Sequence, residues 1–479
     1  MAGEATEQSP PPPPTPPPTS PRPPVPPAQV PPAQDPPAQD PPAQDPPAPD
    51  EQPPGATPSD QAALASAALV PLLRNRDFRR LWIGQAFSDL GTNMAALAYP
   101  LLVLALTGSP VQAGLVGSAT LLAQAVFGIP AGALVDRWNR RKLMIMCETV
   151  RALAAAILVV AILTGWASVP LIIVVGVVSS AAGVLFGPSQ TAALRHIVPT
   201  VQLPRASARI EARTYAAELA GPPLGGALFA VTRFAPFLAD AVSYVISLVS
   251  VLTIKRPLQD ERTGHHERLL PAIWTGLRFV VREPFLRATL CSAPLVNAAF
   301  TGVMFVLVVV LQQRGTPAAG IGAVQSAILV GGLLGALIAP WLQPRVKTPV
   351  LIIAFLWIIV GLVAAAAAMP GTYAVALPLA CGLLLAPSLN AALFGYQIAI
   401  TPDAMQGRVD SVLGVLAQAL NPLAPLAGGV LVTQAGGRWA FVVFAGVLAV
   451  AAIIASVSKG IRHMRPLDEI RSPAGQGAR

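Results

Sequence analysis

Apolar residues recur in blocks of about 20 along most of this 479-residue chain, and short polar turns separate the blocks. A helix of that length crosses the roughly 30 Å hydrocarbon layer of a membrane. The blocks are continuous rather than alternating, which excludes the strands of a membrane barrel. The fold class predicted is therefore an all-α polytopic membrane protein with twelve spans. Their expected extents are 82–106, 111–134, 143–164, 169–191, 209–231, 235–254, 285–311, 318–342, 348–369, 372–398, 410–433 and 438–457.

Composition agrees with the pattern of blocks, except at the N-terminus. Charged residues make up 11% of the chain, under half the roughly 25% of a soluble protein. The first 60 residues hold 25 of the 52 prolines and eight acidic residues against Arg22 alone. Such a segment has almost nothing apolar to bury, so residues 1–70 are predicted to be a disordered, Pro-rich cytoplasmic tail. A solvated tail is the favoured interpretation, and a tether for a protein that recognises proline is the alternative.

The charge of the predicted loops alternates along the chain. Basic clusters precede the first span, fill the 135–142 turn, follow the fourth span at Arg195, Arg205 and Arg209, and recur in the linker from Lys255 to Arg282. The turns that alternate with them carry one basic residue or none. Lysine and arginine mark the cytoplasmic side of a membrane protein. Both termini are therefore predicted to be cytoplasmic, in a multi-pass protein of the plasma (cell or inner) membrane.

An internal repeat appears when the chain is displaced by 203 residues. Trp138 then falls on Trp341, Arg205 on Arg408 and Pro222 on Pro425. The repeat predicts two six-helix bundles, 71–256 and 281–459, that enter the membrane in the same sense, as in a two-bundle transporter. The segment 257–280 is predicted to be a cytoplasmic linker with an interfacial helix, and 460–479 a cytoplasmic tail.

The turn between the second and third predicted spans reads "GALVDRWNRRK", and it resembles the loop 2–3 signature of the major facilitator superfamily. The matching residues are Gly132, Asp136, Arg137, Asn139, Arg140 and Arg141. Asn139 stands where the family has glycine, and asparagine is the next-best residue for a left-handed turn. The resemblance implies the major facilitator fold, with Asp136 as a conformational latch that faces the N-terminus of the eleventh span near Gly407 and Arg408. The counterpart of Asp136 in the second half is Ala339, so the latch is not duplicated.

A second stretch, "AGPPLGG", resembles the fifth-span signature of the family's efflux antiporters. Its residues are Gly221, Pro222, Gly225 and Gly226. Gly221 and Gly225 form a small-xxx-small face that allows a neighbouring helix to approach closely. Pro222 and Pro223 are expected to bend the helix, with neighbours satisfying the carbonyls that they free. Together with "FRRLWIGQAFSDLG", "VRALAAA" and "FLADAVSYVIS", this resembles the branch of macrolide and siderophore exporters and implies drug efflux by proton antiport.

Acidic residues within predicted spans are functional candidates because a charge inside the bilayer is costly. Asp89, Glu218 and Asp240 are the candidates for proton coupling, and ion pairs that fix helix packing are the rival interpretation. Glu148 and Glu211 lie near cytoplasmic ends, where Arg151 and Arg213 are expected to pair with them. The fourth span lacks the arginine that many proton-antiporting relatives carry, which leaves the coupling mechanism open.

Polar and aromatic residues are sparse on the spans that line such cavities. The substrate-cavity candidates are Gln85, Asn93, Tyr99, Asn297, Phe305, Asn390, Tyr396 and Gln397. A sparse polar set in an apolar cavity favours a bulky amphipathic small molecule over a sugar or a phosphate.

Other classes of function lack their signatures in this sequence. No G-x-x-x-x-G-K-[ST] loop is present, which excludes an ATP-driven pump of the P-loop type. No catalytic or metal-ligating cluster is apparent, so no enzyme, cofactor, metal or nucleic-acid partner is expected. The expected partners are a small-molecule substrate, a proton as coupling ion and the lipid bilayer, with the protein acting as a monomer. Two alternatives remain, an uptake symporter for a small metabolite and a non-transporting receptor or scaffold.

Overall fold

The computed structural model describes residues 71–464 except 255, 257 and 260–268. By packing, the chain divides into Met1–Thr57 and Pro58–Arg479, and all described residues belong to the second unit. The predicted Pro-rich tail, 1–70, and most of the predicted C-terminal tail lie outside the described residues. Among those that are described, every regular element is a helix.

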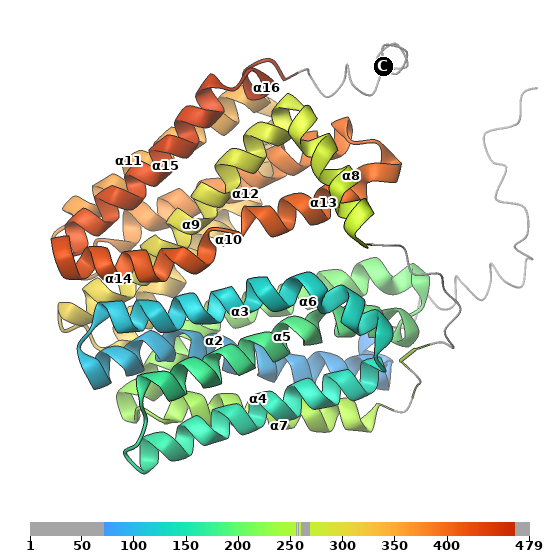
Figure 1. Ribbon diagram of the computed structural model, residues 1–479, viewed down its shortest axis with the longest axis vertical. Coiled ribbons are helices and arrows are strands. Elements are labelled where there is room, and N and C mark those ends of the chain that lie inside the picture. The colour runs from blue at the N-terminus through green and yellow to red at the C-terminus, as the bar shows by residue number, and fades with distance from the viewer. Residues whose placement is uncertain (1–70, 255, 257, 260–268, 465–479) are drawn as a thin grey trace, which may run out of the picture. The chain divides into compact units, whose positions relative to one another are not determined.

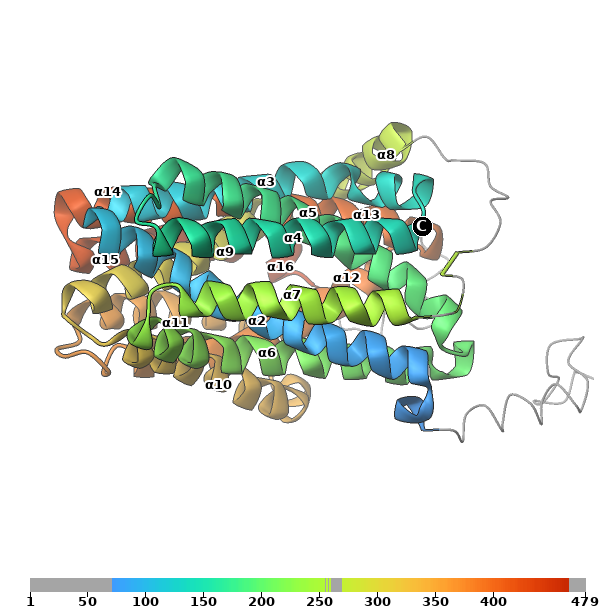
Figure 2. The ribbon, with the colours of Figure 1, turned by 90° about the horizontal axis from the view of Figure 1, so that it is seen from below.

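Long helices run side by side through this unit (Figures 1 and 2). In the first half they are η1 (Leu72–Arg74), α2 (Arg76–Thr107), α3 (Pro110–Arg137), α4 (Arg140–Leu163), α5 (Val169–Ile197), η2 (Thr200–Gln202), α6 (Leu203–Val231) and α7 (Ala235–Thr253). After α8 (Leu269–Arg282), the second half has α9 (Pro284–Gln313), α10 (Ala318–Leu342), η3 (Gln343–Arg345), α11 (Thr348–Ala368), α12 (Ala376–Ile400), α13 (Asp403–Ala417), η4 (Asn421–Leu423), α14 (Ala424–Ala435), α15 (Gly437–Val457) and α16 (Lys459–Arg462).

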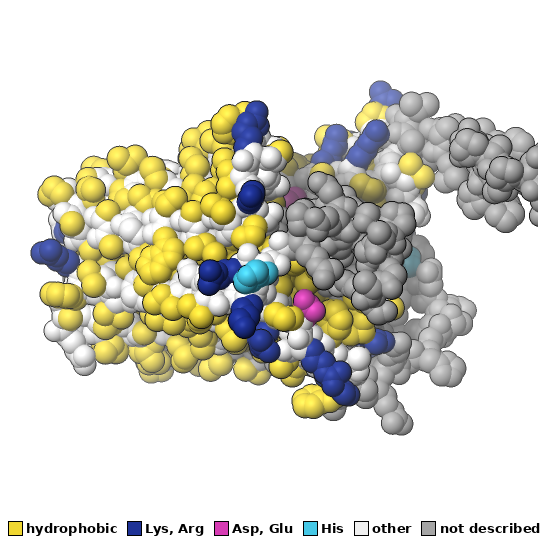
Figure 3. Space-filling model, turned by 90° about the horizontal axis from the view of Figure 1, so that it is seen from above, with side chains coloured by type: hydrophobic (Ala, Val, Ile, Leu, Met, Phe, Trp, Pro, Cys, Tyr) yellow, Lys and Arg dark blue, Asp and Glu magenta, His cyan; other side chains and the backbone are white. Residues whose placement is uncertain are grey.

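Eleven of the described helices, with α13 to α14 taken as one, are long and apolar enough to cross a membrane. The predicted fifth span is the exception, because α6 carries Arg209, Glu211, Arg213 and Glu218 along its 29 residues. Its length is nevertheless that of a span, and it packs between α2 and α10. Hydrophobic side chains are spread over much of the described surface in Figure 3, which suits contact with lipid.

The helix ends follow local signals in the sequence. Asn75 caps α2 by accepting from the backbone N–H groups of Asp77 and Phe78, and Gly108, at φ +65°, ends the helix. Asn139 caps α4 in the same way by accepting from Lys142 N. Its φ is −67°, so the prediction of a left-handed turn at Asn139 is wrong. The side chain serves the next helix as an N-cap, which a glycine would not do.

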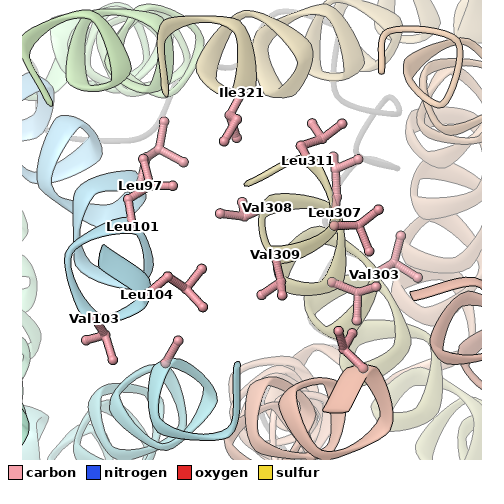
Figure 4. Close-up of a cluster of buried hydrophobic side chains, with 14 of the residues drawn as sticks. Leu97, Leu101, Val103, Leu104, Val303, Leu307, Val308, Val309, Leu311 and Ile321 are labelled. Atoms are coloured by element: carbon pink, nitrogen blue, oxygen red, sulfur yellow. The ribbon is translucent and has the colours of Figure 1, made fainter. Parts of the chain in front are cut away.

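The described helices form two bundles, α2–α7 and α9–α15, which lie as lower and upper layers in Figure 1. We call the end where α3 turns into α4 and α7 leads to α8 the linker face, and the other end the opposite face. One hydrophobic core joins both bundles in the half near the opposite face, with residues such as Leu101 of α2 and Val308 of α9 pointing toward each other (Figure 4). Near the linker face each bundle has a separate core.

Glycines allow the bundles to touch near the opposite face. Gly226 of α6 lies against the backbone of Ala318 in α10, and Gly429 of α14 lies against the backbone of Pro110 in α3. A side chain at either position would collide with that backbone. A hydroxyl group adds a hydrogen bond to the contact between α6 and α10: Ser326 Oγ donates to Leu219 O at 2.6 Å. That carbonyl is free because Pro223, four residues later, has no N–H to give.

The eleventh span is interrupted, whereas α6 continues through Pro222 and Pro223. α13 ends at Ala417, a turn follows over 418–420, and the chain resumes at η4 and α14. Pro422 has no N–H to continue the ladder, and Asn297 Nδ2 of α9 donates to the exposed carbonyl of Ala417 at 3.0 Å. The predicted cavity residue Asn297 thus satisfies the backbone at this break.

Candidate functional site: a cavity between the two bundles

A cavity of about 740 Å³ lies between the bundles at the middle of the long helices. It is bounded mainly by α2, α3, α5 and α6 on one side and by α9 and α10 on the other. Most of its wall is apolar, and its polar residues are Thr92, Asn93, Tyr99, Thr120, Gln124, Arg151, Ser179, Ser180, Glu218, Asp240, Tyr244 and Gln325. A cavity of this size admits a drug-sized molecule.

The structure brings some of the predicted residues to this cavity. Asn93, Tyr99, Phe305, Glu218 and Asp240 line it. Asp240 is 4% exposed, and its Oδ1 has no hydrogen-bond partner in the described part of the chain. Glu218 is half-buried and forms no hydrogen bond or ion pair with the described residues.

Other predicted residues lie elsewhere. Gln85 is buried and donates to Glu148 and Ser247, Tyr396 packs edge-on against Phe285, and Gln397 donates to Asp410 at 2.5 Å. Asn390 is exposed and, like Asn297, is not among the residues that line the cavity. In this structure none of these five residues lines the cavity: four of them contact local partners, and Asn390 is exposed.

Arg151 is the charged cavity residue that sequence reasoning assigned elsewhere. Its side chain is largely buried, and Nη2 donates to Thr92 Oγ1 at 2.8 Å and to Tyr244 Oη at 2.9 Å. Its guanidinium also stacks on the Tyr244 ring, 4.1 Å from the centroid, a cation–π contact. Tyr244 lies one turn after Asp240 on α7. This i, i+4 pair in the sixth predicted span, together with an arginine in the third, was the sequence signal that could have indicated the contact.

The predicted pairing of neighbouring charges is replaced by contacts between helices. Arg213 does not pair with Glu211, because its Nε lies 3.0 Å from Asp89 Oδ2 on α2. Glu148 is fully buried, and its Oε1 accepts from Gln85 Nε2 at 3.0 Å and from Ser247 Oγ at 2.8 Å. Asp89 thus has the ion pair that the rival interpretation expected.

The two signature motifs take different positions. Gly221 and Gly225 of α6 lie against Asn93 and Met94 of α2, and Gly226 faces α10. At the linker face, Arg140 Nη1 contacts His196 Nε2 at 3.0 Å, and Arg141 Nη2 donates to Leu252 O at 2.8 Å. Gly132 and Arg137 lie at the end of α3, and the side chain of Asp136 is outside what the structure describes.

Membrane-spanning helices in two bundles around a central cavity are the architecture of a secondary transporter. The chain belongs to the Major Facilitator Superfamily, whose family model matches residues 81–420. Membership makes it a multi-pass membrane transporter rather than an enzyme.

Similar proteins agree with that membership, and a solved structure shares the fold. The multidrug efflux pump Tap of Mycolicibacterium fortuitum is 29% identical over 363 residues, which cover 72% of this chain and 87% of the relative. Macrolide efflux protein A of Streptococcus pyogenes is 24% identical over 264 residues, 54% of this chain and 65% of the relative. In fold, a bacterial homologue of the iron transporter ferroportin in the inward-facing state has a TM-score of 0.66 at 15% identity, covering 81% of this chain and 99% of that one.

Proposed function

We propose that this transporter exports a bulky amphipathic small molecule by alternating access, in exchange for protons. The observation that carries the proposal is the cavity between the bundles, with an apolar wall and the carboxyl groups of Glu218 and Asp240 at its surface. The names of the relatives, a multidrug efflux pump and a macrolide efflux protein, support export over uptake. Drug and macrolide classes are therefore the first compounds to test.

Twelve spans in two six-helix bundles are part of the proposal, with 71–256 and 281–459 as the bundles and 257–280 as the linker. α6, the fifth in chain order, brings the eleven apolar spans to twelve, since it fills the place between α2 and α10 that a membrane-crossing helix would fill. The parallel repeat is supported by the use of Gly226 and Gly429, which are 203 residues apart, in the two contacts between bundles.

The linker face is assigned to the cytoplasm, together with both termini, by the positive-inside effect. The bundles share one core near the opposite face and have separate cores near the linker face. The conformation is therefore inward-facing, with the outward path closed by the glycine contacts. Export then requires the linker face to close, and the loop 2–3 motif around Asp136 is proposed to hold that closed state against the N-terminus of α13.

Proton coupling is assigned to Asp240 and Glu218. Asp240 is buried at the cavity wall and lies close enough to Arg151 for their charges to attract. A carboxyl that loses and regains a proton there changes the charge balance around Arg151 in each cycle. Asp89 is assigned to helix packing instead, because Arg213 already neutralises it.

The test is transport in proteoliposomes with an imposed pH gradient. The wild-type protein should move a macrolide or another amphipathic drug against its gradient in the direction opposite to the protons, whereas Asp240→Asn and Glu218→Gln should lose pH-driven movement. Glu283→Gln, before α9 and outside the cavity, is the control and should transport normally. Movement of the drug in the same direction as the protons would identify an uptake symporter, and full activity in both cavity variants would overturn the coupling assignment.

A further inference from the structure

The charged residues of the cavity all belong to the N-terminal bundle. Arg151, Glu218 and Asp240 project from α4, α6 and α7. The C-terminal bundle contributes apolar and aromatic side chains such as Phe300, Met304 and Phe305, with Gln325 as its polar member. A ligand in this cavity therefore meets charge on one side and an apolar wall on the other.

Arg151 is held in place by contacts within its own bundle. Its guanidinium donates to Thr92 and Tyr244 and stacks on the Tyr244 ring. Its charge also attracts two carboxyl groups of its own bundle, those of Glu148 and Asp240. The charge of the Arg151 guanidinium is therefore already offset by carboxyl groups of its own bundle.

Glu218 is the charge that remains unbalanced. Within the described part of the chain it has no ion pair and no hydrogen bond, and the charges that act on it come from Glu211 and Asp89, which are also acids. A carboxylate without a counter-ion at this depth is costly, and a bound cation removes that cost. The balance of charge in the cavity therefore favours a ligand with one positive charge.

The same face of α6 continues toward the linker face. Glu218 and Pro222 line the cavity, and Tyr215 and Glu211 precede them at helical spacing on that face. Tyr215 is 61% exposed and Glu211 is exposed. An aromatic ring between two carboxylates attracts a cation both by charge and through the face of the ring, so this strip leads a cationic molecule from the linker face to Glu218.

We propose that the substrate is an amphipathic monocation, with its charged group at Glu218 of the N-terminal bundle and its apolar body against α9 and α10 of the C-terminal bundle. The inference rests on the proposed function in one respect, since it takes this cavity to be the transport site. It adds the charge of the substrate and its orientation.

Equilibrium binding to the purified full-length protein in lipid nanodiscs tests the charge. Tetraphenylphosphonium and tetraphenylborate have nearly the same shape and opposite charge, and triphenylphosphine oxide is a neutral probe of similar bulk. The wild-type protein should bind the phosphonium at least about tenfold more tightly than either of the others, about 1.4 kcal/mol. Equal binding of the two ions would overturn the inference.

Variants test the residue and the orientation. Glu218→Gln should weaken phosphonium binding about tenfold and leave the neutral probe unaffected, whereas Glu218→Asp should keep the preference for the cation. Phe305→Ala should weaken both probes, because it removes part of the apolar wall. An unchanged phosphonium affinity in Glu218→Gln, with the variant folded as judged by its binding of the neutral probe, would overturn the assignment.

The outcome separates this inference from the proposed function. If a pH gradient drives a neutral drug through the protein and the phosphonium shows no preference, the charge assignment fails and export stands. If phosphonium binding depends on Glu218 but a pH gradient drives the transport of no compound, the proposal of proton-coupled export fails and the cation site stands.

Discussion

Arg213 of α6 and Asp89 of α2 form an ion pair inside the N-terminal bundle, with Arg213 Nε 3.0 Å from Asp89 Oδ2. The arginine side chain is 5% exposed and the aspartate side chain 26% exposed. Thr214 Oγ1 also donates to Asp89 Oδ2, at 3.4 Å. The pair links α6, which carries Glu218, to α2, the first helix of the N-terminal bundle. Because α6 also packs against α10 of the C-terminal bundle, the pair sets the position of a helix that contacts both bundles.

Removal of Asp89 should destabilise the protein because it leaves a buried guanidinium without its counter-ion. Breaking a buried pair costs about 3–5 kcal/mol, and the partial exposure of Asp89 places the expected loss near the lower end. Asp89→Asn should therefore lower the melting temperature in detergent. Combining it with Arg213→Gln should restore most of the loss, because no charge then remains buried. A single variant as stable as wild type would contradict the structural role.

Glu148 gives a second prediction, since it is fully buried and its Oε1 accepts hydrogen bonds from Gln85 and Ser247. Its Oε2 has no partner among the described residues. Glu148→Gln keeps an acceptor oxygen for both donors and removes the charge, so stability should be kept or raised. Glu148→Ala leaves the Ser247 hydroxyl and one N–H of Gln85 without their acceptor, at about 1–3 kcal/mol for each buried group. Thermal unfolding of the two variants side by side checks the ranking, and a glutamine variant as unstable as the alanine variant would refute it.

The helices of this fold could be predicted because a membrane helix is specified locally. Block length and turn residues placed most spans to within a few residues, and the weak apolar character of 209–231 was visible because α6 carries several charges. The small residues Gly221 and Gly225 also indicated close packing before any neighbour was known. Each of these properties depends on residues within one helix.

The partners of the buried polar groups could not be predicted, because they depend on which helices become neighbours. Arg213 is two residues from Glu211 in sequence, yet it pairs with Asp89 of another helix. Gln397 and Asn297 were expected in the cavity, and each instead satisfies a group on α13. Sequence spacing identifies which residues need a partner, and only the packing of the bundle decides which partner they receive.

The glycine contacts near the opposite face predict a selective effect on conformation. Gly226→Ala would place a methyl group on the backbone of Ala318, so the closed opposite face should loosen and the outward-facing population should rise. Gly446→Ala in α15, where nothing lies within 4 Å, is the matched control. Spin labels at Trp166 and Trp439, both exposed near the opposite face, should show a longer mean distance in Gly226→Ala alone. Identical distance distributions in both variants would exclude a role for this contact.

The loop 2–3 motif gives the last prediction, because its acidic residue is present in one half of the chain only. Asp136 corresponds to Ala339 in the second half, and Ala339 is buried in α10, so a bulky side chain there would disturb packing. Ala339→Ser is therefore a mild comparison. If Asp136 faces the positive N-terminal end of α13 when the linker face closes, Asp136→Asn should slow transport in proteoliposomes at least about tenfold while substrate binding persists, since roughly 1.4 kcal/mol of the closed state is lost. Ala339→Ser should remain close to wild type. Equal transport rates in the two variants would reduce the motif to a signal for topology, carried by Arg137, Arg140 and Arg141 alone.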